Sequence, residues 1–176
     1  MNFAQVLKMV TAFLEDEGFD HALIGGLAMA AYGMPRTTID LDLVVAGEAQ
    51  DDLIKFLESQ GYETLHRSTG YSNHLHEDPE LGRVDIVYVR DKTSRELFAD
   101  VRRAPGPDEV EVPVLRPAHL VAMKVFAMKN DPSRTFRELA DIRFLMTISG
   151  LKRDEVRGYF EKHGLEHRYA ELEKTL

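Results

Sequence analysis

The sequence contains no cysteine, which excludes disulfide scaffolds, thiolate zinc sites and cysteine nucleophiles. No apolar stretch approaches the roughly 18 to 20 residues that span a bilayer, and the first five residues lack the basic leader and apolar run of a secretory signal. We therefore expect a cytoplasmic protein without a membrane segment. Basic residues are outnumbered, 22 against 30 acidic ones, and the net charge of −8 argues against non-specific coating of nucleic acid. A local basic patch could still bind the end of a nucleic-acid strand.

The 176 residues suffice for one compact domain with a helical appendage, and a hydrophobic content of 44% excludes a disordered chain. Hydrophobic periodicity and Gly or Pro breakers predict a mixture of helices and strands in the first part of the chain and only helices after about residue 116. The predicted helices cover 2–17, 27–32, 49–60, 94–103, 117–129, 133–147, 151–163 and 165–175. The predicted strands cover 21–24, 37–45, 62–66, 72–77, 83–89 and, as an edge strand, 109–114. We expect an α/β fold with a mixed sheet flanked by helices at 1–115, and a C-terminal helical region at 116–176 packed on it.

Asp40 and Asp42 stand two residues apart on the predicted strand 37–45, so both carboxylates point to the same face of the sheet. At a separation of about 6 to 7 Å they repel one another, and a fold tolerates this best with a cation between them. Oxygen ligands in a chain without cysteine favour a hard ion such as Mg²⁺ over zinc. Asp and Leu would alternate in the same way on an ordinary strand whose leucines face the core and whose aspartates face solvent.

Gly25 and Gly26 lie between a predicted strand and a predicted helix. Glycines in such a turn let backbone N–H groups approach a phosphate at the helix N-terminus, although a Gly-Gly pair also occurs in ordinary tight turns. No Gly-Lys-Ser/Thr follows, so this is not a Walker loop. Thirteen residues separate Gly26 from Asp40, enough for one helix and a return to a neighbouring strand, which would place the turn beside the two aspartates.

Three segments together resemble the DNA polymerase beta-like nucleotidyltransferase superfamily: Leu23-Ile24-Gly25-Gly26, Asp40-Leu41-Asp42-Leu43 and Val84-Asp85-Ile86. The run from Gly25 to Asp42 is closer still to the minimal branch that includes the AbiEii-type toxins. That branch also carries a helical Lys and a later Arg, acid, Asp signature, resembled here by Lys124 and by Arg137-Glu138-Leu139-Ala140-Asp141. The chain departs from the pattern in having Gly26 where Ser is common, and Glu138 where the toxin branch usually has Asp.

The resemblance implies an enzyme that transfers a nucleoside monophosphate from a nucleoside triphosphate to a hydroxyl acceptor. Asp40, Asp42 and Asp85 would hold Mg²⁺ or Mn²⁺, and Asp85 would also take the proton of the attacking hydroxyl. The implied nucleotide-binding residues are Gly25 and Gly26 for the β- and γ-phosphates, with Lys124, Arg36, Arg137 and Asp141.

Four of these residues also have simpler interpretations. Lys124 lies in an otherwise apolar stretch, so its ammonium needs an anion, either the triphosphate or an internal carboxylate of Glu138 or Asp141. Arg137 and Asp141 have the i, i+4 spacing of an intrahelical ion pair. Arg36 could face the triphosphate or only cap a loop.

The sequence leaves the acceptor open between an RNA end, a protein hydroxyl and a small molecule such as an aminoglycoside-like antibiotic. The resemblance to the toxins favours tRNA by analogy and implies a cognate antitoxin protein as a partner. The alternative is a catalytically inert module that binds a nucleotide or a partner protein. An inert copy would be free to lose its three acids and Lys124, and this chain retains them.

Overall fold

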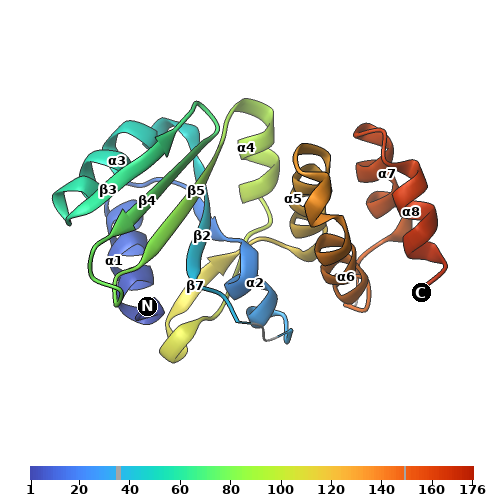
Figure 1. Cartoon of the computed structure of the whole chain (residues 1–176), viewed down its shortest axis with the longest axis horizontal. Helices are drawn as coiled ribbons and strands as arrows, with labels where there is room; N and C mark the ends of the chain where they lie inside the picture. The colour runs from blue at the N-terminus through green and yellow to red at the C-terminus, as the bar shows by residue number, and fades with distance from the viewer. Residues whose placement is uncertain (35–36, 149) are drawn as a thin grey trace. The chain divides into compact units, whose positions relative to one another are not determined.

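The computed structural model describes residues 1–34, 37–148 and 150–176. It divides into two compact units, Met1–Leu115 and Arg116–Leu176. The first unit combines a sheet with helices and the second is helical (Figure 1). None of the helices in these described ranges is long and apolar enough to cross a membrane.

The first unit contains four α-helices and seven strands within the described residues. In chain order they are α1 (Phe3–Asp16), β1 (His21–Leu23), α2 (Gly25–Ala31), β2 (Asp40–Ala46), α3 (Gln50–Ser59), β3 (Tyr62–Arg67), β4 (Tyr71–His76), β5 (Arg83–Val89), α4 (Asp91–Phe98), β6 (Arg102–Pro105) and β7 (Glu111–Val114). Short 3-10 turns, η1 (Gly47–Ala49) and η2 (Pro107–Glu109), precede α3 and β7.

The strands form one mixed sheet in the order β3-β4-β5-β2-β1-β7-β6. The central strand β2 runs parallel to β5 and antiparallel to β1. Alternate residues of the two parallel strands, such as Leu41, Leu43, Val84 and Ile86, are fully buried, because successive strand residues face opposite sides of a sheet. The predicted α/β fold with a mixed sheet is confirmed.

Two helices of this unit are amphipathic and bury one face each. In α1 the buried side chains recur at helical spacing, as in Val6, Val10 and Leu14, and in α3 they include Leu53 and Leu57. Apolar positions three and four apart form a single stripe on a helix, so this spacing favours a helix that covers a sheet. Contacts of α1 with β2 and of α3 with β3 place these helices against the sheet.

Two sequence predictions in this unit are wrong. The helix predicted over 94–103 ends at Phe98, and residues 102–105 form strand β6. The strand predicted as an edge, β7, instead pairs with both β1 and β6, so β6 is the edge. The error arises because Arg102 and Arg103 suit a helix as well as a strand, and because Pro113 suggested an edge position.

The second unit consists of α5 (Pro117–Asn130), α6 (Thr135–Leu145), α7 (Arg153–Lys162) and α8 (Glu166–Glu173), with a 3-10 turn, η3 (Pro132–Arg134), before α6. Pro117 occupies the first turn of α5, where its missing N–H costs nothing. The helices α5, α6 and α7 share a core of buried apolar side chains that includes Val121, Ile142 and Phe160. The four helices predicted after residue 116 are confirmed, with ends shifted by a few residues.

Candidate active site

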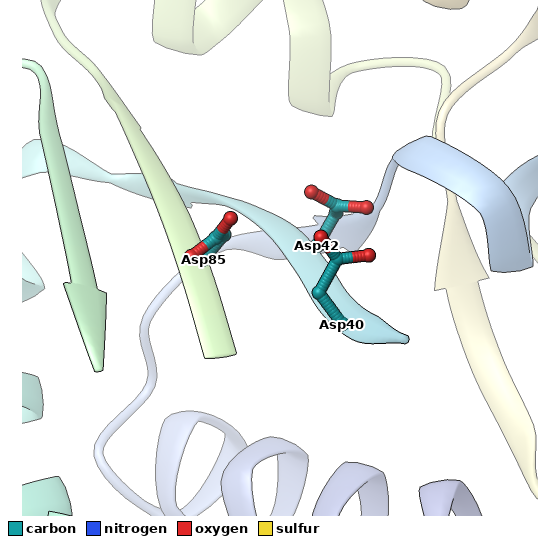
Figure 2. A group of neighbouring side chains, drawn as sticks. All are labelled: Asp40, Asp42 and Asp85. Atoms are coloured by element: carbon teal, nitrogen blue, oxygen red, sulfur yellow. The ribbon is translucent and has the colours of Figure 1, made fainter. Parts of the chain in front are cut away.

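Three aspartates from two adjacent strands converge on one face of the sheet. One carboxylate oxygen from each of Asp40, Asp42 and Asp85 lies within 4.8 Å of the others. Asp40 and Asp42 come from β2, and the register pairs Asp42 with Asp85 on the parallel strand β5. Figure 2 shows the three side chains gathered on the same side of these two strands. The predicted common face of Asp40 and Asp42 is therefore present, and Asp85 completes a group of three.

The face that carries the aspartates is the polar side of strands whose other side is core. Leu41, between the two acids, is fully buried, whereas the three aspartates are half-buried. Carboxylates held this close repel one another unless cations lie between them. An all-oxygen group of this kind suits hard divalent ions such as Mg²⁺ or Mn²⁺, and such a triad is typical of metal-dependent nucleotidyltransferases.

Asp40 is held by a residue that sequence reasoning missed. The Thr38 hydroxyl donates a hydrogen bond of 2.7 Å to Asp40 Oδ1. Thr38 also lies against Gly26, where an added Cβ would come within 2.8 Å of the Thr38 Cβ. The alternation of Thr38, Asp40 and Asp42 was the signal that could have identified this contact. The strand itself begins only at Asp40, later than the predicted residue 37.

Gly25 and Gly26 lie directly beside the acids, as their spacing from Asp40 predicted. A Cβ added to Gly25 would lie 2.0 Å from Asp42 Oδ2, and the Gly25 φ of +63° is one that L side chains rarely adopt. The backbone N–H of Ile24 also donates to the Asp42 carbonyl oxygen. Gly25 therefore gives the Asp42 carboxylate the room it occupies. Gly25 and Gly26 stand inside the first turn of α2 rather than in a turn before it.

Asp85 has a cationic neighbour that the sequence analysis also missed. The guanidinium of Arg83 donates from Nε to Asp85 Oδ1 at 2.8 Å, and this hydrogen bond raises the pKa of Arg83. Arg83 and Asp85 are two residues apart on β5, so they share a face. Tyr71 of β4 lies close by, where burial and then the Asp85 charge raise the pKa of its phenol. The Asp85 carboxylate is therefore oriented by neighbours on its own face.

In the helical unit, Lys124 lies in a buried ion network. Its Nζ donates to Glu138 Oε2 at 3.0 Å and to Asp141 Oδ2 at 2.5 Å. Arg134 donates twice to Glu138 Oε1, at 3.0 and 2.6 Å. The side chains of Glu138 and Asp141 are 1% and 3% exposed and that of Lys124 is 11% exposed. The anionic partner that Lys124 was expected to need is present within the unit.

Two further predicted nucleotide contacts are Arg137 and Arg36. Arg137 is exposed on α6, next to the buried Glu138. Arg36 lies outside the described residues.

Solved structures similar to this chain are nucleotidyltransferases. The antibiotic-resistance factor ANT(2″)-Ia is 18% identical with a TM-score of 0.69, covering 99% of this chain and 98% of its own. The lincosamide antibiotic adenylyltransferase LnuA is 15% identical with a TM-score of 0.55, covering 82% and 97%. A CCA-adding enzyme solved with ATP is 14% identical with a TM-score of 0.51, covering 97% of this chain and 46% of its own. The fold is therefore that of the polymerase beta-like nucleotidyltransferases.

The family can be stated more narrowly. The model of the family described as nucleotidyl transferase AbiEii toxin, type IV toxin-antitoxin system, matches residues 79–176, more than half of the chain. This chain belongs to that family, as the resemblance of its motifs implied. The matched segment contains Asp85 and the ion network around Lys124, whereas Asp40 and Asp42 precede it. No curated protein matches the chain.

Proposed function

We propose that this chain transfers a nucleoside monophosphate from a nucleoside triphosphate to a hydroxyl acceptor, using divalent metal ions held by Asp40, Asp42 and Asp85. The observation that carries the proposal is the convergence of the three carboxylates within 4.8 Å. Membership of the AbiEii family supports the reaction class. An isolated pair of acids on a solvated strand would need neither the third acid nor Gly25, which makes room for Asp42.

The proposed chemistry gives each acid a role. Asp40 and Asp42 bind the metal ions, and Asp85 binds metal on the acceptor side. When bound, the ions neutralise the charge on the triphosphate and lower the pKa of the attacking hydroxyl. Asp85 accepts the hydroxyl proton as the acceptor oxygen bonds to the α-phosphorus, and the bond from that phosphorus to pyrophosphate breaks. Arg83 fixes the orientation of the Asp85 carboxylate.

The nucleotide-binding residues form the second part of the proposal. We assign the β- and γ-phosphates to the backbone of Gly25, which lies against Asp42, and of Gly26, which lies against Thr38. We divide the roles at residue 115, with the chemistry in 1–115 and additional nucleotide contacts from 116–176. There Lys124 would meet the triphosphate with Asp141 orienting its ammonium, and Arg137 and Arg36 would add positive charge.

The acceptor and the partner extend the proposal. ANT(2″)-Ia is an antibiotic-resistance factor that has been solved with adenylyl-2″-tobramycin, LnuA is a lincosamide antibiotic adenylyltransferase, and the CCA-adding enzyme has been solved with ATP. We propose an RNA end, tRNA included, or a small-molecule hydroxyl as the acceptor here. Because the family is that of a toxin-antitoxin system, we also propose an antitoxin protein as a partner.

The experiment is transfer of label from each of the four nucleoside triphosphates, carrying ³²P at the α-position, with Mg²⁺. Total cellular RNA and tobramycin serve as separate acceptors, and Asp85→Asn serves as the inactive control. Mg²⁺-dependent label in either acceptor, absent with the variant, is the expected result. Binding of Mg²⁺-nucleotide without any transfer would instead favour the inert nucleotide-binding module.

A further inference from the structure

Thr38 lies between Gly26 and Asp40, two residues that the proposed function assigns to a phosphate and to a metal ion. Its hydroxyl donates a hydrogen bond of 2.7 Å to Asp40 Oδ1, and its side chain lies against Gly26. The residue is half-buried and stands just before β2 begins. The Thr38 hydroxyl therefore lies at the edge of the carboxylate group, in contact with one of the proposed metal ligands.

The Thr38 side chain, rather than the backbone conformation, accounts for a glycine at position 26. The φ of Gly26 is not positive, unlike that of Gly25, so its backbone would accept an L side chain. A Cβ at Gly26 would however lie 2.8 Å from the Thr38 Cβ, 3.0 Å from Oγ1 and 3.4 Å from Cγ2. The side chain of Thr38 fills this space, so Gly26 sets the position of its hydroxyl.

A hydroxyl in this position can change its partner without moving a heavy atom, because it carries one proton and two lone pairs and its O–H bond rotates. In the ligand-free protein the proton points at Asp40. When Asp40 binds a cation, the proton is repelled and turns away from it. A phosphate oxygen that shares this cation with Asp40 lies beside the hydroxyl and is a charged acceptor for its proton.

We propose that the Thr38 hydroxyl binds the triphosphate of the nucleotide, and that its hydrogen bond to Asp40 holds it in place until the nucleotide arrives. Position 26 carries no side chain, so residue 38 supplies the hydroxyl at this point of the site. Thr38 donates a hydrogen bond and transfers no proton. Its role is to bind the nucleotide, not to take part in the bonds that form and break.

This inference rests on the proposed function and adds a nucleotide-binding residue to its site. The competing role for Thr38 is to orient the Asp40 carboxylate and nothing more. Orientation of Asp40 affects metal binding with or without nucleotide, whereas a phosphate contact affects nucleotide binding alone. The two probes are therefore Mn²⁺ without nucleotide, and Mg²⁺ with the best bound of four non-hydrolysable nucleoside triphosphates.

The first test compares Thr38→Val, which replaces the hydroxyl by a methyl group of similar size, with Thr38→Ser, which keeps the hydroxyl. Thr37→Val, at the exposed neighbouring threonine, is the matched control. Thr38→Val should bind Mn²⁺ within about twofold of wild type and the nucleotide at least about tenfold more weakly, because a hydrogen bond to a charged phosphate is lost. Thr38→Ser and Thr37→Val should bind both probes within about threefold of wild type.

The outcomes separate the inference from the proposed function. A smaller loss of nucleotide affinity in Thr38→Val, or a similar loss in Thr38→Ser, overturns the inference. An equal loss of Mn²⁺ and nucleotide affinity in Thr38→Val also overturns it, because Thr38 then acts only through Asp40. A wild-type protein that binds no nucleotide refutes the proposed function itself, and this inference with it.

The second test concerns the space that Gly26 and Thr38 share, and it uses unfolding in urea without ligands. Gly26→Ser places a Cβ against the Thr38 side chain and should lower the urea midpoint, whereas Thr38→Gly removes the side chain that this Cβ meets. In the double variant the two losses of stability should therefore not add. Additive losses would mean that Gly26 does not set the position of the Thr38 hydroxyl, and would overturn the proposal.

Discussion

Replacing Lys124 by Met should lower the stability of the ligand-free protein, because it removes the cation that two buried carboxylates share. Removing one partner of a buried ion pair typically costs about 3 to 5 kcal/mol. Arg134 still holds one oxygen of Glu138 in the variant, so we expect the lower end of this range, about 3 kcal/mol. For a chain of this size that corresponds to a melting temperature lower by roughly 10 °C.

Thermal and urea unfolding of the ligand-free protein measure this loss. Lys129→Met, at an exposed lysine of the same helix, is the matched control and should change stability by less than about 0.5 kcal/mol. Adding Asp141→Leu to Lys124→Met should recover part of the loss, since it removes one of the two buried carboxylates that Lys124 neutralised. A Lys124→Met protein that melts with the wild type would refute the reasoning. Nucleotide titration of the same variant tests separately whether Lys124 contacts the triphosphate. If it does, nucleotide binding by Lys124→Met should be ten- to hundredfold weaker, a loss of about 1.5 to 3 kcal/mol in binding free energy.

Three further predictions follow from particular contacts. Burial lowers the pKa of His74 from 6.5 to about 4. Between these two pH values the unfolded chain binds a proton at His74 and the folded chain does not. The contribution of His74 to the free energy of unfolding should therefore be constant above about pH 6.5 and fall by roughly 3 kcal/mol towards pH 4. In urea unfolding across this pH range, the free energy of unfolding should change less with pH for His74→Gln than for wild type. It should change as in wild type for His66→Gln, at an exposed histidine. Gly25→Ala should destabilise the protein by more than about 1 kcal/mol, which is the cost of the positive φ alone. It should also abolish Mg²⁺-nucleotide binding, because the new methyl group displaces the Asp42 side chain. Binding at the wild-type affinity in a calorimetric titration would contradict this prediction. Asp85→Asn should bind nucleotide within about threefold of wild type and lose at least about a hundredfold in turnover, and retained turnover in single-turnover assays would remove Asp85 as the base.

The face that carries Asp40 and Asp42 could be predicted from sequence because it depends on local geometry. Residues two apart on a strand share a face whatever the rest of the fold does, so Asp40 and Asp42 were assigned together. Asp85 needed the resemblance to a family, because its pairing with Asp42 depends on the register of two strands that are distant in the chain. That register is fixed by the packing of the whole sheet and leaves no local signal.

The neighbours of Asp85 could not be recognised for the same reason. Asn73 and Tyr71 look like ordinary polar residues of an exposed strand until the β4–β5 register places them beside the acid. Strand β6 was missed because its two arginines carry no apolar alternation, and because its pairing with β7 is a contact that the sequence does not reveal. The helical unit was easier, since apolar residues at helical spacing and Gly or Pro breakers are local features.

The central claim is that the three aspartates hold metal ions for nucleotide binding, and calorimetric titration with a non-hydrolysable nucleoside triphosphate tests it most directly. Wild type, Asp42→Asn and the exposed control Asp16→Asn would be compared with and without Mg²⁺. The account predicts Mg²⁺-dependent binding by wild type and Asp16→Asn, and its loss in Asp42→Asn without a fall in melting temperature, since that change relieves charge repulsion. Binding that is independent of Mg²⁺, or equal in all three proteins, would contradict the claim.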